Sequence, residues 1–140
     1  MFEIAIALTD AEIQRCFPVM HQLRPHLVEA EFVQRVRQQE AQQYHLVRLE
    51  ENGEVKAVSG FRLGDNLAWG RFLYVDDLVT QEGDRAKGYG RALFDWLVDY
   101  AKMHHCQQLH LDSGVQRFDA HRFYMNRGMV IRAHHFGLEL

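Results

Sequence analysis

The strongest structural signal in this chain is the segment Arg85-Ala86-Lys87-Gly88-Tyr89-Gly90-Arg91. It follows an apolar, strand-like run and precedes a helix-like pattern of apolar residues at Leu93, Phe94, Leu97, Val98 and Ala101. Glycines let a backbone approach a ligand closely, and the first N–H groups of a helix have no partners within it. Nearby cations and the helix dipole add positive charge. The segment therefore predicts a site for a phosphorylated ligand; the competing interpretation is an ordinary tight turn that caps the helix.

The composition predicts one soluble globular domain over residues 1–140, with 47% apolar and 25% charged residues. A formal net charge of -3 argues against non-specific nucleic-acid binding, which needs a basic surface. No apolar run approaches the roughly 20 residues that span a bilayer. The N-terminal Met1-Phe2-Glu3-Ile4 lacks the basic region of a secretory leader. We therefore expect a cytoplasmic protein without a membrane or nucleic-acid partner.

Cysteine and histidine do not predict a metal centre. Cys16 and Cys106 are too few for a disulfide framework, and we expect both to be small buried hydrophobic residues. Nine histidines invite a metal hypothesis, but four of them form the adjacent pairs 104–105 and 134–135, whose side chains diverge. No HExxH or CxxC spacing accompanies them, so no metal is predicted.

Hydrophobic periodicity predicts an alternation of strands and helices. Strands are expected at residues 2–8, 44–50, 54–63, 67–79, 107–112, 129–133 and 135–138, and helices at 9–23, 29–42, after the glycine segment, and at 119–126. Thr9 and Glu12 form a capping box, Asn52-Gly53 is a hairpin turn, and Gly128 is a C-terminal helix cap. The order predicts a mixed sheet with helices on both faces.

In two motifs the chain resembles the GNAT superfamily of N-acetyltransferases. The glycine segment, preceded by Leu78-Val79-Thr80, is similar to its signature Gln/Arg-x-x-Gly-x-Gly/Ala after the fourth strand. Ala120-His121-Arg122-Phe123-Tyr124 with Gly128-Met129 resembles its C-terminal motif. The specific likeness covers residues 70–140. The resemblance implies an α/β (α+β) fold whose mixed, mostly antiparallel central sheet has about six to seven strands, with the fourth and fifth splayed and helices on both faces.

The resemblance also implies a cosubstrate, acetyl coenzyme A, and a place for it. Its pantetheine arm would pair with the backbone of Leu78, Val79 and Thr80, where Thr80 replaces the usual valine. Its pyrophosphate would rest on the amides of Arg85, Ala86, Lys87, Gly88, Tyr89, Gly90 and Arg91. Ser113, Asp119 and Phe123 would complete the cofactor site. Asp119 replaces a common asparagine, and a helix N-cap is its alternative role.

Acetyl transfer to an amine needs a group that removes a proton from the amine and one that protonates the leaving thiolate. Asp76 and Asp77 are the best-placed carboxylates for the first task. Side chains alternate along a strand, so only one of them should face the cleft; which one it is stays open, because a bulge would reverse the parity. Polar-rim carboxylates are the alternative. The resemblance makes Tyr124 the general acid, against a buried tyrosine with a structural role, and makes the Val79 N–H the group that polarises the thioester carbonyl.

The function implied is transfer of an acetyl group from acetyl coenzyme A directly to a primary amine of a small molecule or peptide. The alternative is a non-catalytic acyl-coenzyme-A-binding sensor with the same fold. A Walker motif is absent and the glycines follow a late strand, which disfavours nucleotide binding. Pocket walls are expected from residues 20–30 and 134–136, where Arg24 either pairs with an acidic substrate group or is solvated. The resemblance also implies that a homodimer can form.

Overall fold

The structure, a computed structural model, describes the backbone of residues 1–140 and every side chain except that of Ala86. It contains two compact units, residues 1–110 and residues 111–140. The elements are β1 (Phe2–Ile6), α1 (Asp10–Arg15), α2 (Phe17–Leu23), η1 (Glu29–Glu31), α3 (Phe32–Glu40), β2 (Tyr44–Glu51), β3 (Glu54–Asn66), β4 (Gly70–Thr80), η2 (Arg85–Lys87), α4 (Tyr89–Met103), β5 (Gln108–Leu111) and α5 (Phe118–Asn126).

The sheet has five strands in the order β1-β2-β3-β4-β5. β1 pairs antiparallel with β2, β2 with β3, and β3 with β4. β5 begins beside the start of β4, where the Gln107 N–H donates to the Arg71 carbonyl at 2.8 Å. The prediction of six to seven strands is wrong, because residues 129–140 form none in the described structure. Alternating apolar residues predict a strand only where a neighbour pairs with the backbone, and Val130, Ile131 and Phe136 are exposed.

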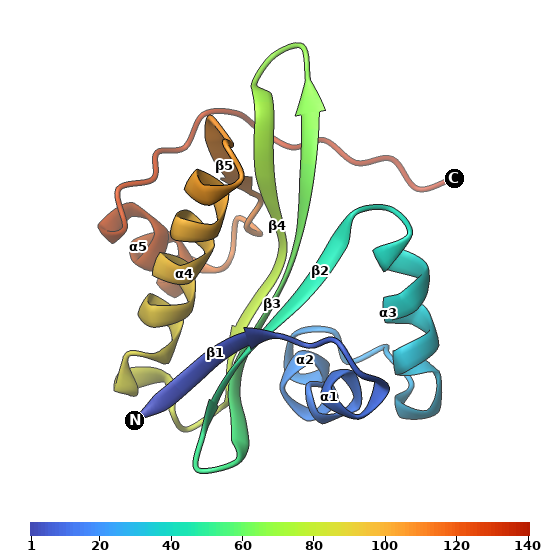
Figure 1. The fold of residues 1–140 in the computed structure, drawn as a ribbon. Coiled ribbons are helices and arrows are strands. Elements are labelled where there is room, and N and C mark those ends of the chain that lie inside the picture. The colour runs from blue at the N-terminus through green and yellow to red at the C-terminus, as the bar shows by residue number, and fades with distance from the viewer. The chain divides into compact units, whose positions relative to one another are not determined.

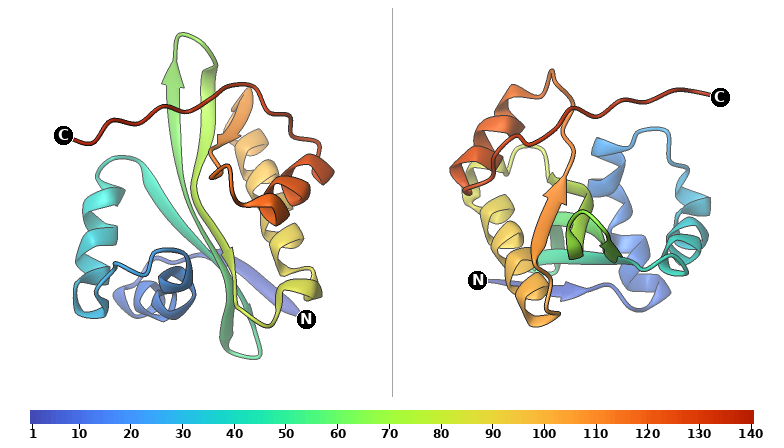
Figure 2. Two further views of the ribbon diagram at one scale, coloured as in Figure 1. Left: turned by 180° about the vertical axis from the view of Figure 1, so that it is seen from behind. Right: turned by 90° about the horizontal axis from the view of Figure 1, so that it is seen from above.

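Helices cover both faces of this sheet in the first unit, as predicted. Figures 1 and 2 show α1, α2 and α3 on one face and α4 on the other. The α1–α3 side holds a buried cluster that includes Ile13, Phe17, Phe32 and Val79. On the α4 side, the ring of Phe61 packs against Trp96 and Tyr100 of α4. The two faces of β4 therefore belong to different cores.

The helix predicted over residues 9–23 is in fact two helices, α1 and α2. Its start is as predicted, since Thr9 and Glu12 form a capping box. Its break lies at Cys16, which is the C-cap of α1 and the N-cap of α2. Pro18, in the first turn of α2, has no N–H to donate to the preceding turn, so a continuous helix cannot form there.

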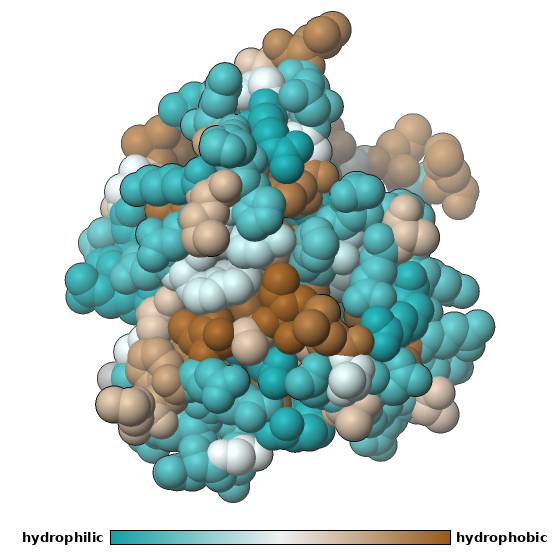
Figure 3. All heavy atoms as spheres, viewed as in Figure 1, coloured by the Kyte–Doolittle hydropathy of each residue, from teal (hydrophilic) through white to brown (hydrophobic). Residues whose placement is uncertain are grey.

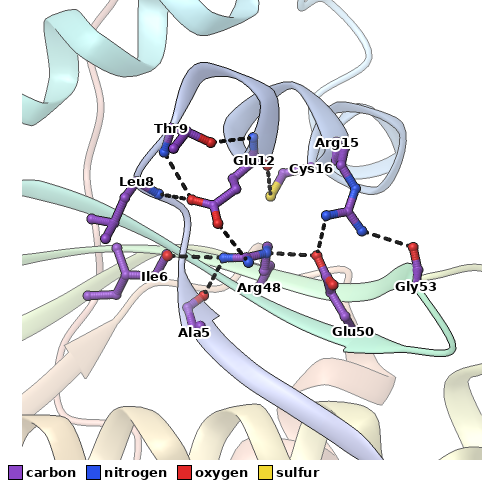
Figure 4. Close-up of polar contacts among 10 residues, drawn as sticks. All are labelled: Ala5, Ile6, Leu8, Thr9, Glu12, Arg15, Cys16, Arg48, Glu50 and Gly53. Atoms are coloured by element: carbon purple, nitrogen blue, oxygen red, sulfur yellow. Dashed lines mark hydrogen bonds and ion pairs between the residues drawn. The ribbon is translucent and has the colours of Figure 1, made fainter.

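A buried arginine ties β1 and α1 to β2 (Figure 4). Arg48, 7% exposed, donates to the carbonyls of Ala5 and Ile6 at 3.3 and 3.0 Å. Its guanidinium also pairs with Glu12 at 3.2 Å and Glu50 at 2.8 Å. Buried charges in proteins are stable when they are paired and hydrogen-bonded in this way.

Hydrophilic residues cover most of the face drawn in Figure 3, and apolar residues gather near the end of β1. Among the described residues, no helix is long and apolar enough to cross a membrane.

Candidate active site

The glycine segment forms the turn into α4. Gly88 is the N-cap of this 15-residue helix, with a left-handed φ of 83° that favours glycine. A Cβ added to Gly88 would meet nothing within 4 Å, so the space in front of the helix end is open. The Ala92 N–H donates to the Gly88 carbonyl at 3.1 Å, which leaves the amides of residues 89–91 in the first turn, where helix N–H groups lack intrahelical partners. This geometry suits an anion.

The charged residues around this turn differ in their surroundings. Lys87 and Lys56 of β3 both contact the Asp84 carboxylate, at 2.9 and 3.5 Å. Arg85 and Arg91 are exposed beside the turn. The Tyr89 side chain turns into the protein, since the residue is 3% exposed and its hydroxyl donates to Glu51 at 2.6 Å. Only the backbone of Tyr89 is therefore available to a ligand here. The side chain of Ala86 lies outside the described part of the structure.

The expectation that one of Asp76 and Asp77 faces away from the cleft is wrong, because β4 contains a bulge. Gly60 lies opposite Asp77 and Phe61 lies opposite Val75, so Asp76 is an extra residue in β4. The Ser59 hydroxyl donates to the Asp77 carbonyl at 2.7 Å and holds this backbone. The bulge places both carboxylates on the α1–α3 face.

Each carboxylate has its own arginine. Asp77 accepts from the Arg24 Nε at 2.8 Å with one oxygen and from the Tyr44 hydroxyl at 3.0 Å with the other. Asp76 accepts from the Arg62 Nε at 2.9 Å with its Oδ2. Burial raises the pKa of Asp76 above its ordinary value, although the Arg62 guanidinium opposes the shift. Burial and the nearby Asp77 charge raise the pKa of Tyr44 well above the ordinary value of a tyrosine.

Both carboxylates line a cavity of about 160 Å³ between β4 and the helices α2 and α3. Apolar side chains form one part of its wall, and polar and charged side chains form the rest. The lining residues are Met20, Arg24, His26, Leu27, Phe32, Arg35, Val36, Gln39, Tyr44, Asp76 and Asp77. Four of these lining residues, Met20, Arg24, His26 and Leu27, fall within residues 20–30, one of the two ranges expected to form pocket walls.

The second unit carries the remaining predicted residues. Tyr124 lies in α5 and packs edge-on against Phe123, with ring centroids 5.6 Å apart. Burial raises the pKa of the Tyr124 hydroxyl. The Ser113 hydroxyl is buried and has no hydrogen-bond partner among the described residues.

The N-cap alternative for Asp119 is wrong. α5 begins at Phe118 with Arg117 as its N-cap, so Asp119 lies inside the first turn and pairs with Arg122. The ring of His121 hydrogen-bonds the Gly114 carbonyl at 2.8 Å.

The sequence interpretation missed Tyr44 and Arg62, the side chains that hold the two carboxylates. Arg62 could have been found from the β3–β4 hairpin, because its register partner is Tyr74 and Asp76 comes next on the same face. Tyr44 is 33 residues from Asp77 and carries no local signal. Among the residues that the structure describes, no group of three or more His, Cys, Asp or Glu side chains is placed to hold a metal ion.

Comparisons with known proteins show the family to which this chain belongs. Residues 8–129 match the model of the Acetyltransferase (GNAT) family. The chain is 35% identical to the uncharacterized N-acetyltransferase YhdJ of Bacillus subtilis (strain 168) over 122 residues. The aligned region covers 86% of each protein.

Two solved structures share the fold at low sequence identity. Glucosamine-6-phosphate N-acetyltransferase from Arabidopsis thaliana has a TM-score of 0.80 at 20% identity, over 99% of this chain and 98% of that one. Ribosomal-protein-alanine N-acetyltransferase from Brucella melitensis biovar Abortus 2308 has a TM-score of 0.83 at 17% identity, over 99% of both chains. Because the family model and the Bacillus relative each cover most of the sequence, the chain belongs to the GNAT family of acetyltransferases.

Proposed function

We propose that this chain transfers an acetyl group from acetyl coenzyme A directly to a primary amine that binds in the cavity at the β4 bulge. The observation that carries the proposal is the pair of carboxylates, Asp76 and Asp77, on one side of a strand whose next residues lead to the glycine turn. The family match spans both compact units, which supports one N-acetyltransferase domain over residues 1–140.

The residues at the start of α4 fit the cosubstrate's pyrophosphate. The open space at Gly88 admits a bulky anion, and the first-turn amides with Lys87, Arg85 and Arg91 supply donors and positive charge. When bound, acetyl coenzyme A supplies an activated acyl group. The backbone of Leu78, Val79 and Thr80 would pair with its pantetheine arm beside the splay proposed between β4 and β5. In the second unit, Ser113, Asp119 and Phe123 would complete the site.

Asp76 is the better candidate for the general base. Both oxygens of Asp77 accept hydrogen bonds within the protein, whereas the Oδ1 of Asp76 has no partner among the described residues. The raised pKa of Asp76 also makes it a better proton acceptor than an ordinary aspartate. In the proposed reaction Asp76 takes a proton from the ammonium group, and the neutral amine attacks the thioester carbonyl.

The remaining steps use two further groups. The Val79 N–H would donate to the carbonyl oxygen as it gains charge. When the carbon–sulfur bond breaks, the Tyr124 hydroxyl would give its proton to the thiolate. The nitrogen, which becomes positively charged on attack, would lose its second proton to solvent as the amide forms. Solvent would then take the proton held by Asp76 and return one to Tyr124. A phenol with a raised pKa stays protonated at neutral pH, which suits this role.

The test combines two measurements on the whole chain. Isothermal titration reports binding of acetyl coenzyme A, and a thiol-release assay over a panel of primary amines reports turnover. Amine-dependent release in wild type that is lost in Asp76→Asn, with cofactor affinity retained, supports the proposal. Binding without release on any amine would favour the acyl-coenzyme-A sensor instead.

A further inference from the structure

Arg35 also lines the cavity but, unlike Arg24, it does not pair with Asp76 or Asp77. Arg24 pairs with Asp77 at 2.8 Å, and Arg62 pairs with Asp76 at 2.9 Å. Among the residues that the structure describes, no ion pair or hydrogen bond of Arg35 is found. The charges of the two aspartates are thus balanced within the protein, and the Arg35 guanidinium adds one positive charge to the cavity wall.

The paired aspartates and the positive charge of Arg35 determine which charged groups the cavity can bind. A cavity whose carboxylates are already neutralised gains little from a purely cationic amine, but an exposed guanidinium attracts an anionic group and can bind it through two parallel hydrogen bonds. The cavity wall also has an apolar part, with Met20, Leu27, Phe32 and Val36. A matching molecule carries an amine, a small apolar body and an anion.

The volume limits the size of that body. A cavity of about 160 Å³ is close to the roughly 150 Å³ that holds one benzene molecule. The part of an acceptor that lies inside this partly open cavity therefore has about six non-hydrogen atoms, and the rest of the molecule can extend out of it.

We propose that the acceptor is a small amine that also carries an anionic group, a carboxylate or a phospho group, and that Arg35 binds this group. This inference rests on the proposed function of the same cavity. Arg35 is a specificity-determining residue in this scheme: Asp76 accepts the amine's proton, and the α3 guanidinium orients the molecule through its anionic group.

The test uses matched pairs of acceptors, each an α-amino acid and the amine left when its carboxylate is removed, for example leucine and isoamylamine. The phosphonate analogue of each amino acid forms a third arm that distinguishes the two anions. Thiol release gives kcat and KM for wild type, Arg35→Gln and Arg35→Lys. Arg37→Gln is the matched control, because Arg37 lies on the same helix and pairs with Asp10 and Glu40.

We expect Arg35→Gln to lower kcat/KM for the anionic acceptors by about tenfold, mainly through KM, and to leave the decarboxylated amines unchanged. Arg35→Lys should recover part of the loss, and Arg37→Gln should change neither class. An amino acid and its decarboxylated amine differ in basicity. This difference does not affect the result, because the kcat/KM of each acceptor is compared between wild type and the variants. Release that is equally affected for both classes, or insensitive to Arg35, overturns this inference alone. No release with any amine overturns the proposed function as well.

Discussion

Replacing Arg48 with methionine tests whether the charged network around β1 stabilises the fold. The substitution keeps a long apolar stem and removes the guanidinium, whose side chain is 8% exposed. It leaves the carbonyls of Ala5 and Ile6 without this donor at the sheet edge, and it leaves Glu50 with only Arg15, at 2.8 Å.

The size of the effect follows from these contacts. Removing one partner of a buried ion pair costs about 3–5 kcal/mol. Because Glu12 is 31% exposed and Glu50 keeps a second arginine, we expect the lower end, about 3 kcal/mol. At the usual scaling for a domain of this size, that loss lowers Tm by about 10 °C.

Urea denaturation followed by circular dichroism measures the change in unfolding free energy by linear extrapolation. Arg37→Met is the control, since Arg37 is 39% exposed and its pairs with Asp10 and Glu40 lie at the surface, where the loss should stay below about 1 kcal/mol. Equal losses for Arg48→Met and Arg37→Met would refute the reasoning, because burial would then make no difference.

Four further outcomes follow from the site and the fold. Because burial raises the pKa of Asp76, the acid limb of the rate–pH profile should lie above the ordinary 3.8, and Asp76→Asn should remove that limb and lower kcat at least about a hundredfold. Tyr124→Phe should lower kcat while isothermal titration finds cofactor affinity retained; unchanged turnover would exclude the acid role. Gly88→Ala and Gly83→Ala should each cost about 1 kcal/mol in urea denaturation, since both φ angles are left-handed, but only Gly88→Ala should weaken coenzyme A binding. Burial acts to raise the pKa of Glu50, but hydrogen bonds from Arg48 and Arg15 outweigh it and lower the pKa below 4.5. The stability that this group contributes is therefore present above pH 4.5 and is lost as the pH falls through the lowered pKa. Glu50→Gln should flatten that loss in denaturation curves measured between about pH 3 and pH 5.

Local signals predicted the parts of this fold that depend on neighbouring residues. The Thr9–Glu12 capping box and the Asn52-Gly53 turn follow from backbone groups a few residues apart, and both φ values in that turn are positive. The left-handed Gly88 at the start of α4 is of the same kind. Features that depend on distant partners were not predicted. The Tyr44 hydroxyl reaches Asp77 only after β2, β3 and β4 have paired.

The bulge in β4 is a different case, because the hydrophobic pattern itself required it. Strict alternation after Val75, which faces the α4 core opposite Phe61, would turn Asp77 toward that same apolar core. An unpaired carboxylate there would cost several kcal/mol. One extra residue at Asp76 instead returns Leu78 to the α4 side opposite Ser59, and returns Val79 to the α1–α3 core opposite Val58. The same extra residue places two adjacent carboxylates on one face, which no regular strand can do. Burial of the apolar residues on both faces therefore fixes the geometry on which the proposed proton transfer depends.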